Sequence, residues 1–222
     1  MIRLFYLLFL FLLQCSLFLR CSYTSEGEKK PPNILWITVE DMSPDLGCYG
    51  DTLAHTPNLD ALASKGFRYN NAIANAPVCA PARNAIITGM YPSSLGTLHM
   101  RSFSKNMKSS GRIPAEIKLY PEVLRSAGYY CTNNDKEDYN FNLKREIWDE
   151  SSKTAHWKNR PNKSTSFFSI FNLTLTHESS INSKEKHERV TQDLPDNLRT
   201  NPEKILVPPY YPDTPEVRRL LT

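Results

Sequence analysis

The sequence predicts an α/β fold with a mainly parallel sheet sandwiched between helices. Two observations predict it. Apolar, strand-like runs alternate with helix-like segments along the chain. The first of these runs, residues 33–39, is almost continuously apolar, which is typical of a strand covered by helices on both faces. We therefore expect a central parallel strand here. Since ligands of such folds bind beyond the carboxyl ends of strands, Glu40 and Asp41 become candidate site residues.

Three helices are expected in the first two thirds of the chain. Residues 56–66 begin with Thr56 as a cap and Pro57 at the first helical position, and their apolar residues are spaced three and four apart. Two more helices are predicted over 81–88 and 121–127, each followed by a glycine that ends it.

Further strands are predicted over 67–73, 129–132 and 167–173, where β-branched and aromatic residues are concentrated. Residues 178–222 are polar and rich in proline, and we expect no strand there. Within them, 214–221 opens like a capped helix but continues for only about two turns.

Composition and charge exclude several classes of protein. Of the 222 residues, 23% are charged and 40% hydrophobic, which excludes a disordered charged tail, and 8 Gly with 16 Pro exclude a collagen-like repeat. The formal net charge is +4 from 27 basic and 23 acidic residues, and it falls to +2 without residues 1–22. Because the sequence contains neither a stripe of basic residues nor a nucleic-acid-binding motif, we expect no nucleic acid as a partner.

The N-terminus predicts an exported protein. Arg3 followed by the apolar run 4–13 has the charged and apolar regions of a signal peptide, assigned to 1–22, and the run is short for a spanning helix. The alternative is that this segment is not cleaved and anchors the chain in a membrane. Residues 23–32 are then a linker and 33–222 the folded domain. The predicted location is secreted, periplasmic or lysosomal, with no stable membrane partner beyond the leader.

Three cysteines would remain after removal of the leader, an odd number, so at least one thiol is unpaired, paired with another molecule or chemically used. Cys48 and Cys131 either form a disulfide or stay free.

The most specific string in the sequence is Cys79-Ala-Pro-Ala-Arg83, followed by Thr-Gly-Met-Tyr-Pro at 88–92. It resembles the sulfatase signature, C-x-P-x-R with a downstream T-G-x-Y-P. The segments 32–41 and 56–63 are similar to the first strand and first helix of the same family. The resemblance runs from about residue 31 to the end and covers roughly the N-terminal half of a complete sulfatase. It implies an alkaline-phosphatase/sulfatase-like fold that is incomplete here.

The resemblance also implies the chemistry. In the family, the cysteine of the signature is oxidised to formylglycine, so Cys79 becomes the nucleophile. A hydrated aldehyde has two hydroxyls, one to attack sulfur and one to expel sulfate afterwards. Arg83 lies one helical turn further on. Lys136 takes the place of a sulfate-binding lysine, although the common Gly-Lys-x-His form is absent. His177 resembles a histidine that contacts the sulfate or the leaving oxygen.

A divalent metal, calcium in most of the family, is implied at Glu40, Asp41 and the side chain of residue 79. Carboxylates at a strand end suit such a cation, although the family usually has two aspartates there. Residues 178–222 provide no second acidic pair at the end of an apolar strand.

The predicted function is therefore a sulfuric ester hydrolase acting on a sulfated small molecule or polysaccharide, modified by a formylglycine-generating enzyme. The alternative is a truncated, catalytically inactive sulfatase-like fragment or isoform. A phosphoryl-transfer enzyme of the same superfamily is disfavoured, because those enzymes use Ser or Thr where this chain has Cys79.

Overall fold

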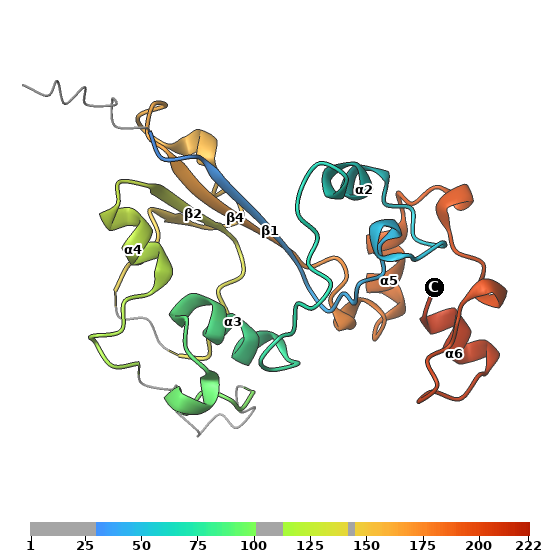
Figure 1. Cartoon of the computed structure of the whole chain (residues 1–222). Coiled ribbons are helices and arrows are strands. Elements are labelled where there is room, and N and C mark those ends of the chain that lie inside the picture. The colour runs from blue at the N-terminus through green and yellow to red at the C-terminus, as the bar shows by residue number, and fades with distance from the viewer. Residues whose placement is uncertain (1–29, 101–112, 142–144) are drawn as a thin grey trace, which may run out of the picture. The chain divides into compact units, whose positions relative to one another are not determined.

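The protein is described by a computed structural model that covers residues 30–100, 113–141 and 145–222, so the predicted leader lies outside the described residues. A four-stranded sheet dominates it (Figure 1). Its strands are β1 (Ile34–Val39), β2 (Tyr130–Asn134), β3 (Glu150–Ser151) and β4 (Phe167–Leu173), in the order β1-β4-β2-β3 and with every neighbouring pair parallel. The α/β class predicted from the sequence is confirmed.

Strand β4 forms the middle of the sheet, and the sequence places it correctly at 167–173. It pairs with β1 from Ile34 opposite Phe168, and with β2 from Tyr130 opposite Phe167. Four of its seven residues are buried, as expected for a strand with a neighbour on each side.

Strand β1 is not central, so this prediction is wrong in position. Within the described chain it has one neighbour, β4, and Leu35 and Ile37 remain 51% and 55% exposed. An apolar run indicates burial on both faces, but it does not reveal which elements supply that burial.

The three predicted helices are confirmed as α2 (Pro57–Ala63), α3 (Cys79–Thr88) and α4 (Tyr120–Ser126). Helix α3 ends at Gly89, whose φ of 67° lies in the left-handed region that a glycine enters without strain. It begins two residues before the predicted start, so that Cys79 is its first residue.

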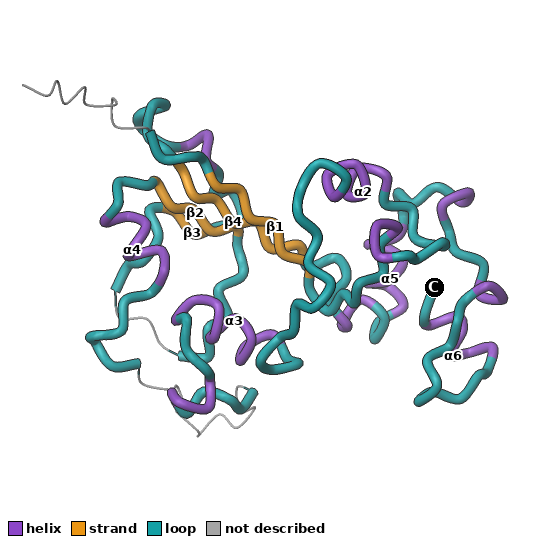
Figure 2. The backbone as a smooth tube through the Cα atoms, viewed as in Figure 1, coloured by secondary structure: helices purple, strands orange, loops and turns teal. Residues whose placement is uncertain are grey.

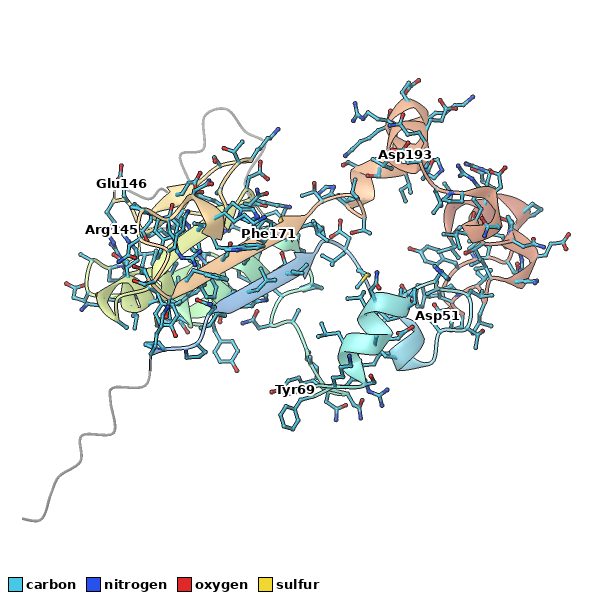
Figure 3. The ribbon with its side chains drawn as sticks, turned by 90° about the horizontal axis from the view of Figure 1, so that it is seen from above. Asp51, Tyr69, Arg145, Glu146, Phe171 and Asp193 are labelled. Carbon is cyan, nitrogen blue, oxygen red and sulfur yellow. The ribbon has the colours of Figure 1, made fainter. Side chains whose placement is uncertain are left out.

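The strand predicted over 67–73 is wrong, because this segment is an exposed loop in the structure. Phe67 and Tyr69 are 98% and 75% exposed, and Figure 3 shows Tyr69 with its segment away from the sheet. A strand requires a ladder partner for its backbone groups, and among the described residues none lies beside this segment.

The hydrophobic core lies between the sheet and helices α3 and α4, which Figure 1 shows beside it. Alternate residues of β4 point to opposite faces. Phe168 and Ile170 enter the core, whereas Phe167 and Phe171 contact the ring of Trp157 in η3 (Trp157–Asn159), a 3-10 helix. The buried core cluster comprises Ile87, Leu119, Cys131, Tyr139, Ile147, Trp148, Phe168 and Ile170.

After β4 the chain is built from short helices and loops (Figure 2). Residues 178–222 contain no strand, as expected, and the predicted terminal helix is α6 (Pro215–Leu220). Helix α5 (Lys184–Thr191) was not predicted, although Ser183 caps it by accepting a hydrogen bond from the Lys186 amide. Over the ranges that the structure describes, no helix has both the length and the apolar character needed to cross a bilayer.

Candidate active site

The candidate nucleophile begins helix α3. Val78 precedes it in an extended conformation, and Cys79 is the first of ten helical residues. The first amides of a helix lack intrahelical acceptors and carry the positive end of its dipole, which favours a negatively charged group nearby. Cys79 is half-buried, so its side chain remains partly accessible to solvent.

Side chains of helix α3 form hydrogen bonds to the loop that follows β2. Arg83 Nε donates to the carbonyl of Glu137 at 2.9 Å, and a second guanidinium nitrogen donates to the carbonyl of Lys136. Asn84, which is fully buried, donates to the carbonyl of Tyr139 at 2.8 Å. These bonds fix residues 136–139 against the middle of the helix.

Glu40 connects the end of β1 to both basic residues. Its side chain is only 6% exposed, and Lys136 Nζ lies 2.7 Å from Oε2 while Arg83 lies 3.5 Å from Oε1. The Glu40 amide donates to Leu173 at 3.1 Å and so continues the β1–β4 ladder by one residue. The structure thus brings together Glu40, Arg83 and Lys136, which are far apart in the sequence.

Two side chains of opposite charge affect the pKa of the Cys79 thiol. Burial raises its pKa most, Lys136 lowers it, and the Asp138 carboxylate raises it both by its charge and as a hydrogen-bond partner. Asp138 is itself 3% exposed and lies 3.7 Å from Lys136 Nζ. Asp138 is not among the residues predicted from the sequence. The available signal was its spacing, because it stands two residues after Lys136, where the Gly-Lys-x-His form has histidine.

Asp41 and His177 lie beyond this cluster but near the same strand end. Asp41 Oδ2 accepts the amide of Glu178 at 2.8 Å, and the Thr176 hydroxyl donates to the carbonyl of Glu40. The segment containing His177 is therefore tied to the end of β1. The His177 ring itself caps η4 (Glu178–Ser180), with Nδ1 3.2 Å from the amide of Ser179.

Comparison with known proteins identifies the family. The profile of the sulfatase family matches residues 32–206, well over half of the chain. The chain belongs to the sulfatase family. The ulvan-active sulfatase of Formosa agariphila is 38% identical over 219 residues, which cover 85% of this chain and 37% of that protein. Human N-acetylgalactosamine-6-sulfatase is 38% identical over 110 residues, 47% of this chain and 21% of that protein.

The fold also agrees with a solved structure. A protein determined in complex with its substrate D-glucosamine-2-N,6-O-disulfate superposes with a TM-score of 0.52 at 21% identity, over 67% of this chain and 35% of that one. This chain therefore spans little more than a third of the length of the ulvan-active sulfatase and of this solved structure.

The sulfatase resemblance implies a calcium ion, but the described residues do not supply a complete set of ligands for it. Calcium takes six to eight oxygen ligands. Across 30–100, 113–141 and 145–222, no three His, Cys, Asp or Glu side chains are grouped so that they could hold a metal. Of the two predicted carboxylates, Glu40 is bonded to Lys136, and Asp41 accepts a backbone amide. As they stand, these residues do not fit the ion.

The three described cysteines of this sulfatase chain are free thiols, so a Cys48–Cys131 disulfide is not formed. Cys131 is fully buried in the core, and burial raises its pKa to about 12. This thiol is therefore a packing group rather than a reactive one.

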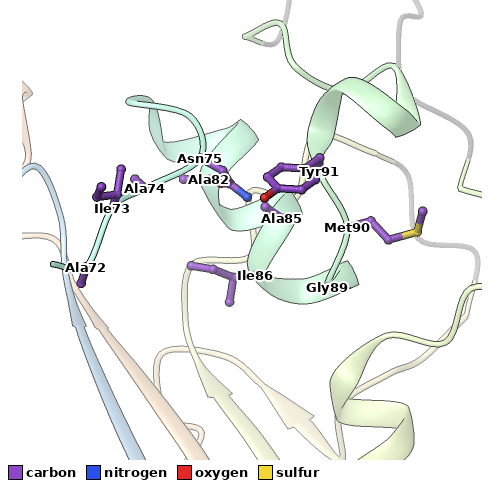
Figure 4. A pocket seen from close by; sticks show the side chains of 10 residues that line it. All are labelled: Ala72, Ile73, Ala74, Asn75, Ala82, Ala85, Ile86, Gly89, Met90 and Tyr91. Atoms are coloured by element: carbon purple, nitrogen blue, oxygen red, sulfur yellow. The ribbon is translucent and has the colours of Figure 1, made fainter. Parts of the chain in front are cut away.

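Helix α3 also borders an open apolar hollow of about 620 Å³ (Figure 4). Ala82, Ala85 and Ile86 line it from the helix, and Met90 and Tyr91 from the residues that follow. None of the predicted site residues lines this hollow, so it is separate from the cluster around Cys79.

Proposed function

We propose that this sulfatase-family chain carries the nucleophile and the anion-binding part of a site that hydrolyses sulfate esters of carbohydrates. The observation that carries the proposal is the position of Cys79 as the first residue of a ten-residue helix whose Arg83 is bonded to the loop that contains Lys136. Formylglycine, once formed from Cys79, supplies a hydroxyl that can attack sulfur.

The charges around residue 79 suit a sulfate group. The N-terminus of α3 and the ammonium of Lys136 both favour an anion there. Arg83 is bonded to two loop carbonyls and to Glu40, so its role is to position Lys136. Because Nδ1 of His177 is used in a local cap, we assign the proposed contact with sulfate or the leaving oxygen to Nε2 of that ring.

The proposed substrate class is sulfated carbohydrate. Its support comes from the relatives, named for ulvan and for N-acetylgalactosamine 6-sulfate, and from the solved neighbour with a disulfated glucosamine substrate. A formylglycine-generating enzyme is the proposed modifying partner, and export through a leader at 1–22 is the proposed route.

Calcium is the proposed cofactor, and Glu40, Asp41 and the side chain of residue 79 would supply only part of its ligands. Because these groups do not meet the coordination of calcium alone, the ion would require further ligands and release of Glu40 from Lys136. We assign no step of the reaction to the metal.

The alternative is a sulfatase-like chain without activity of its own. Its support is the state of the two predicted carboxylates among the described residues, since Glu40 is bonded to Lys136 and Asp41 accepts a backbone amide.

The experiment is to co-express the full chain with a formylglycine-generating enzyme and to examine the Cys79 peptide by mass spectrometry. The protein is then assayed on an aryl sulfate with added calcium, with Cys79→Ala and Cys48→Ala as paired variants. We expect conversion of residue 79 and turnover that only Cys79→Ala abolishes. Equal turnover by the wild type and Cys79→Ala would rule out the proposed mechanism, and conversion without turnover would favour the alternative.

A further inference from the structure

A second, larger hollow of the molecule lies apart from the candidate active site. Its volume is about 840 Å³, and its walls come from two segments, 43–54 after β1 and 200–221 near the C-terminus. None of the residues predicted for the reaction lines it. We propose that this hollow binds an unsulfated sugar unit of the carbohydrate chain whose sulfate ester is the substrate. The proposal rests on the proposed function, which takes carbohydrate as the substrate class.

Three tyrosine rings provide the flat apolar surface on which a sugar ring can pack. Tyr49 lines one wall, and Tyr210 and Tyr211 line the other; 41%, 78% and 53% of these residues are exposed. The rings of Tyr210 and Tyr211 have centroids 5.0 Å apart and are tilted by 56°. The C–H groups on one face of a pyranose pack against such rings, while phenol hydroxyls exchange hydrogen bonds with sugar hydroxyls.

Arg218 holds the C-terminal wall in shape. Its guanidinium donates to the carbonyls of Pro202, Glu203 and Ile205. It also donates to the Asp213 carboxylate, from Nη2 to Oδ2 at 2.7 Å. These bonds fasten both ends of the segment that carries the two tyrosines to helix α6. A wall that is ordered before binding loses little conformational freedom when a ligand binds, which favours affinity.

The charges of the hollow select an uncharged ligand. The charged residues that line it are Asp45, Asp51 and Lys204, so negative charge is in excess. Asp51 Oδ1 accepts the amides of Leu53 and Ala54 at 2.7 and 3.0 Å, which fixes the orientation of this carboxylate. Carboxylates accept hydrogen bonds from sugar hydroxyls, but they repel a sulfate group. The hollow therefore suits an unsulfated unit.

The hollow begins close to the candidate active site along the chain. Ser43 lines it and stands two residues after Asp41, which follows β1. Because consecutive Cα atoms are 3.8 Å apart, the Cα atoms of Asp41 and Ser43 are separated by at most about 7.6 Å. One carbohydrate chain can thus place its sulfated unit at the strand end and an unsulfated unit in the hollow.

The test uses the full chain with residue 79 unmodified, on a glycan array that presents matched sulfated and unsulfated oligosaccharides. We expect the wild type to bind unsulfated members, and Tyr210→Ala to weaken this binding about tenfold, the scale for the loss of an aromatic contact. Phe67→Ala removes an aromatic ring that is 98% exposed outside the hollow, and it should bind as the wild type does. No binding of unsulfated sugars by the wild type, or equal binding by Tyr210→Ala, would overturn the proposal.

The charge of Asp51 provides a second measurement. Asp51→Asn keeps an oxygen that accepts the two amides but removes the negative charge. It should therefore raise the affinity for sulfated members relative to unsulfated ones about threefold, the scale of an exposed charge interaction. Asp193→Asn, the same change at an exposed acid after helix α5, should leave this ratio unchanged. An equal ratio in the wild type and Asp51→Asn would contradict the proposed selection.

Failure of this proposal is distinguishable from failure of the proposed function. Both binding measurements use unmodified protein, so they decide the role of the hollow even if Cys79 is never converted or no turnover is found. Conversely, a hollow that binds no sugar leaves the comparison of the wild type with Cys79→Ala unaffected.

Discussion

At the scale of single residues, the pKa of Cys79 depends on two side chains of opposite charge. The ammonium of Lys136 lowers its pKa, whereas the carboxylate of Asp138 and burial raise it. Burial is the largest of these effects, and the net pKa is above its ordinary value. Because the thiolate is the reactive form, the unmodified protein should have a sluggish thiol at position 79.

The two neighbours should change thiol reactivity in opposite directions. Lys136→Gln removes the positive charge, raises the pKa of Cys79 and should slow its alkylation by iodoacetamide at pH 8. Asp138→Asn removes the negative charge, lowers that pKa and should accelerate it. Alkylation of Cys48, followed in the same samples by peptide mass spectrometry, is the internal control. If both variants change the rate in the same direction, the arrangement around Cys79 is wrong.

The sequence pattern predicts Cys79 and Arg83 from the C-x-P-x-R string and Lys136 from its place after a strand, and these roles stay predictions. It does not include Asp138, whose buried carboxylate lies 3.7 Å from Lys136 Nζ in the structure. It also did not reveal that Glu40 is paired with Lys136, because a carboxylate at a strand end is equally consistent with a metal ligand.

At the scale of elements, helix α4 depends on one acidic residue at its start. Glu122 accepts the amide of Leu119 at 2.8 Å, and Arg145 reaches both of its carboxylate oxygens at 2.6 and 2.9 Å. The hydrogen bonds from Arg145 are the main cause of a lowered Glu122 pKa. The cap thus ties α4 to the segment that precedes β3.

Glu122→Gln should lower the free energy of unfolding by about 1 kcal/mol at pH 7, the scale of a lost helix cap. Since the folded-state pKa of Glu122 is lowered, its contribution is present above the ordinary value of 4.5 and is lost as the pH falls through the folded-state value. Urea unfolding at several pH values should show the wild type and variant converging in acid. Glu116→Gln, an exposed acid in the same segment, is the control, and a difference that persists in acid would contradict the argument.

Elements with local start and stop signals were predictable, as Pro57 and Gly89 illustrate for α2 and α3. The loop at 67–73 was not, because its aromatic residues have strand propensity but no partner strand to pair with. Strand propensity describes how well a residue fits a pleated surface, and tertiary structure decides whether that surface exists.

At the scale of the whole molecule, the described residues cover the two faces of the sheet unequally. Parallel sheets normally have both faces covered by helices. Here α3 and α4 pack on one face, while on the other Trp157 packs against β4 and leaves Leu35 and Ile37 of β1 exposed. Figure 3 shows Phe171 on the same strand that borders β1. An apolar strand at an open edge favours self-association.

Ile37→Lys should reduce concentration-dependent self-association measured by sedimentation velocity, because a charge on an edge strand opposes pairing with another chain. Its cost to the free energy of unfolding should stay within about 0.5 kcal/mol, as at other exposed positions. Leu62→Lys, on helix α2 and 68% exposed, makes a similar apolar-to-Lys change away from the sheet. Equal effects of the two variants would show that net charge, and not the β1 edge, controls association.

Strand β1 also has a consequence for the time course of folding. Its partner residues are distant in the chain, and Thr38 and Asn172, which share a hydrogen bond, are separated by 134 positions. At about 5–20 residues per second, a ribosome needs roughly 7 to 27 seconds to synthesise that interval. Throughout this time the six residues of β1 have no ladder to join, because β4 does not yet exist. The newly made chain would therefore depend on a chaperone during translation more than the finished protein does.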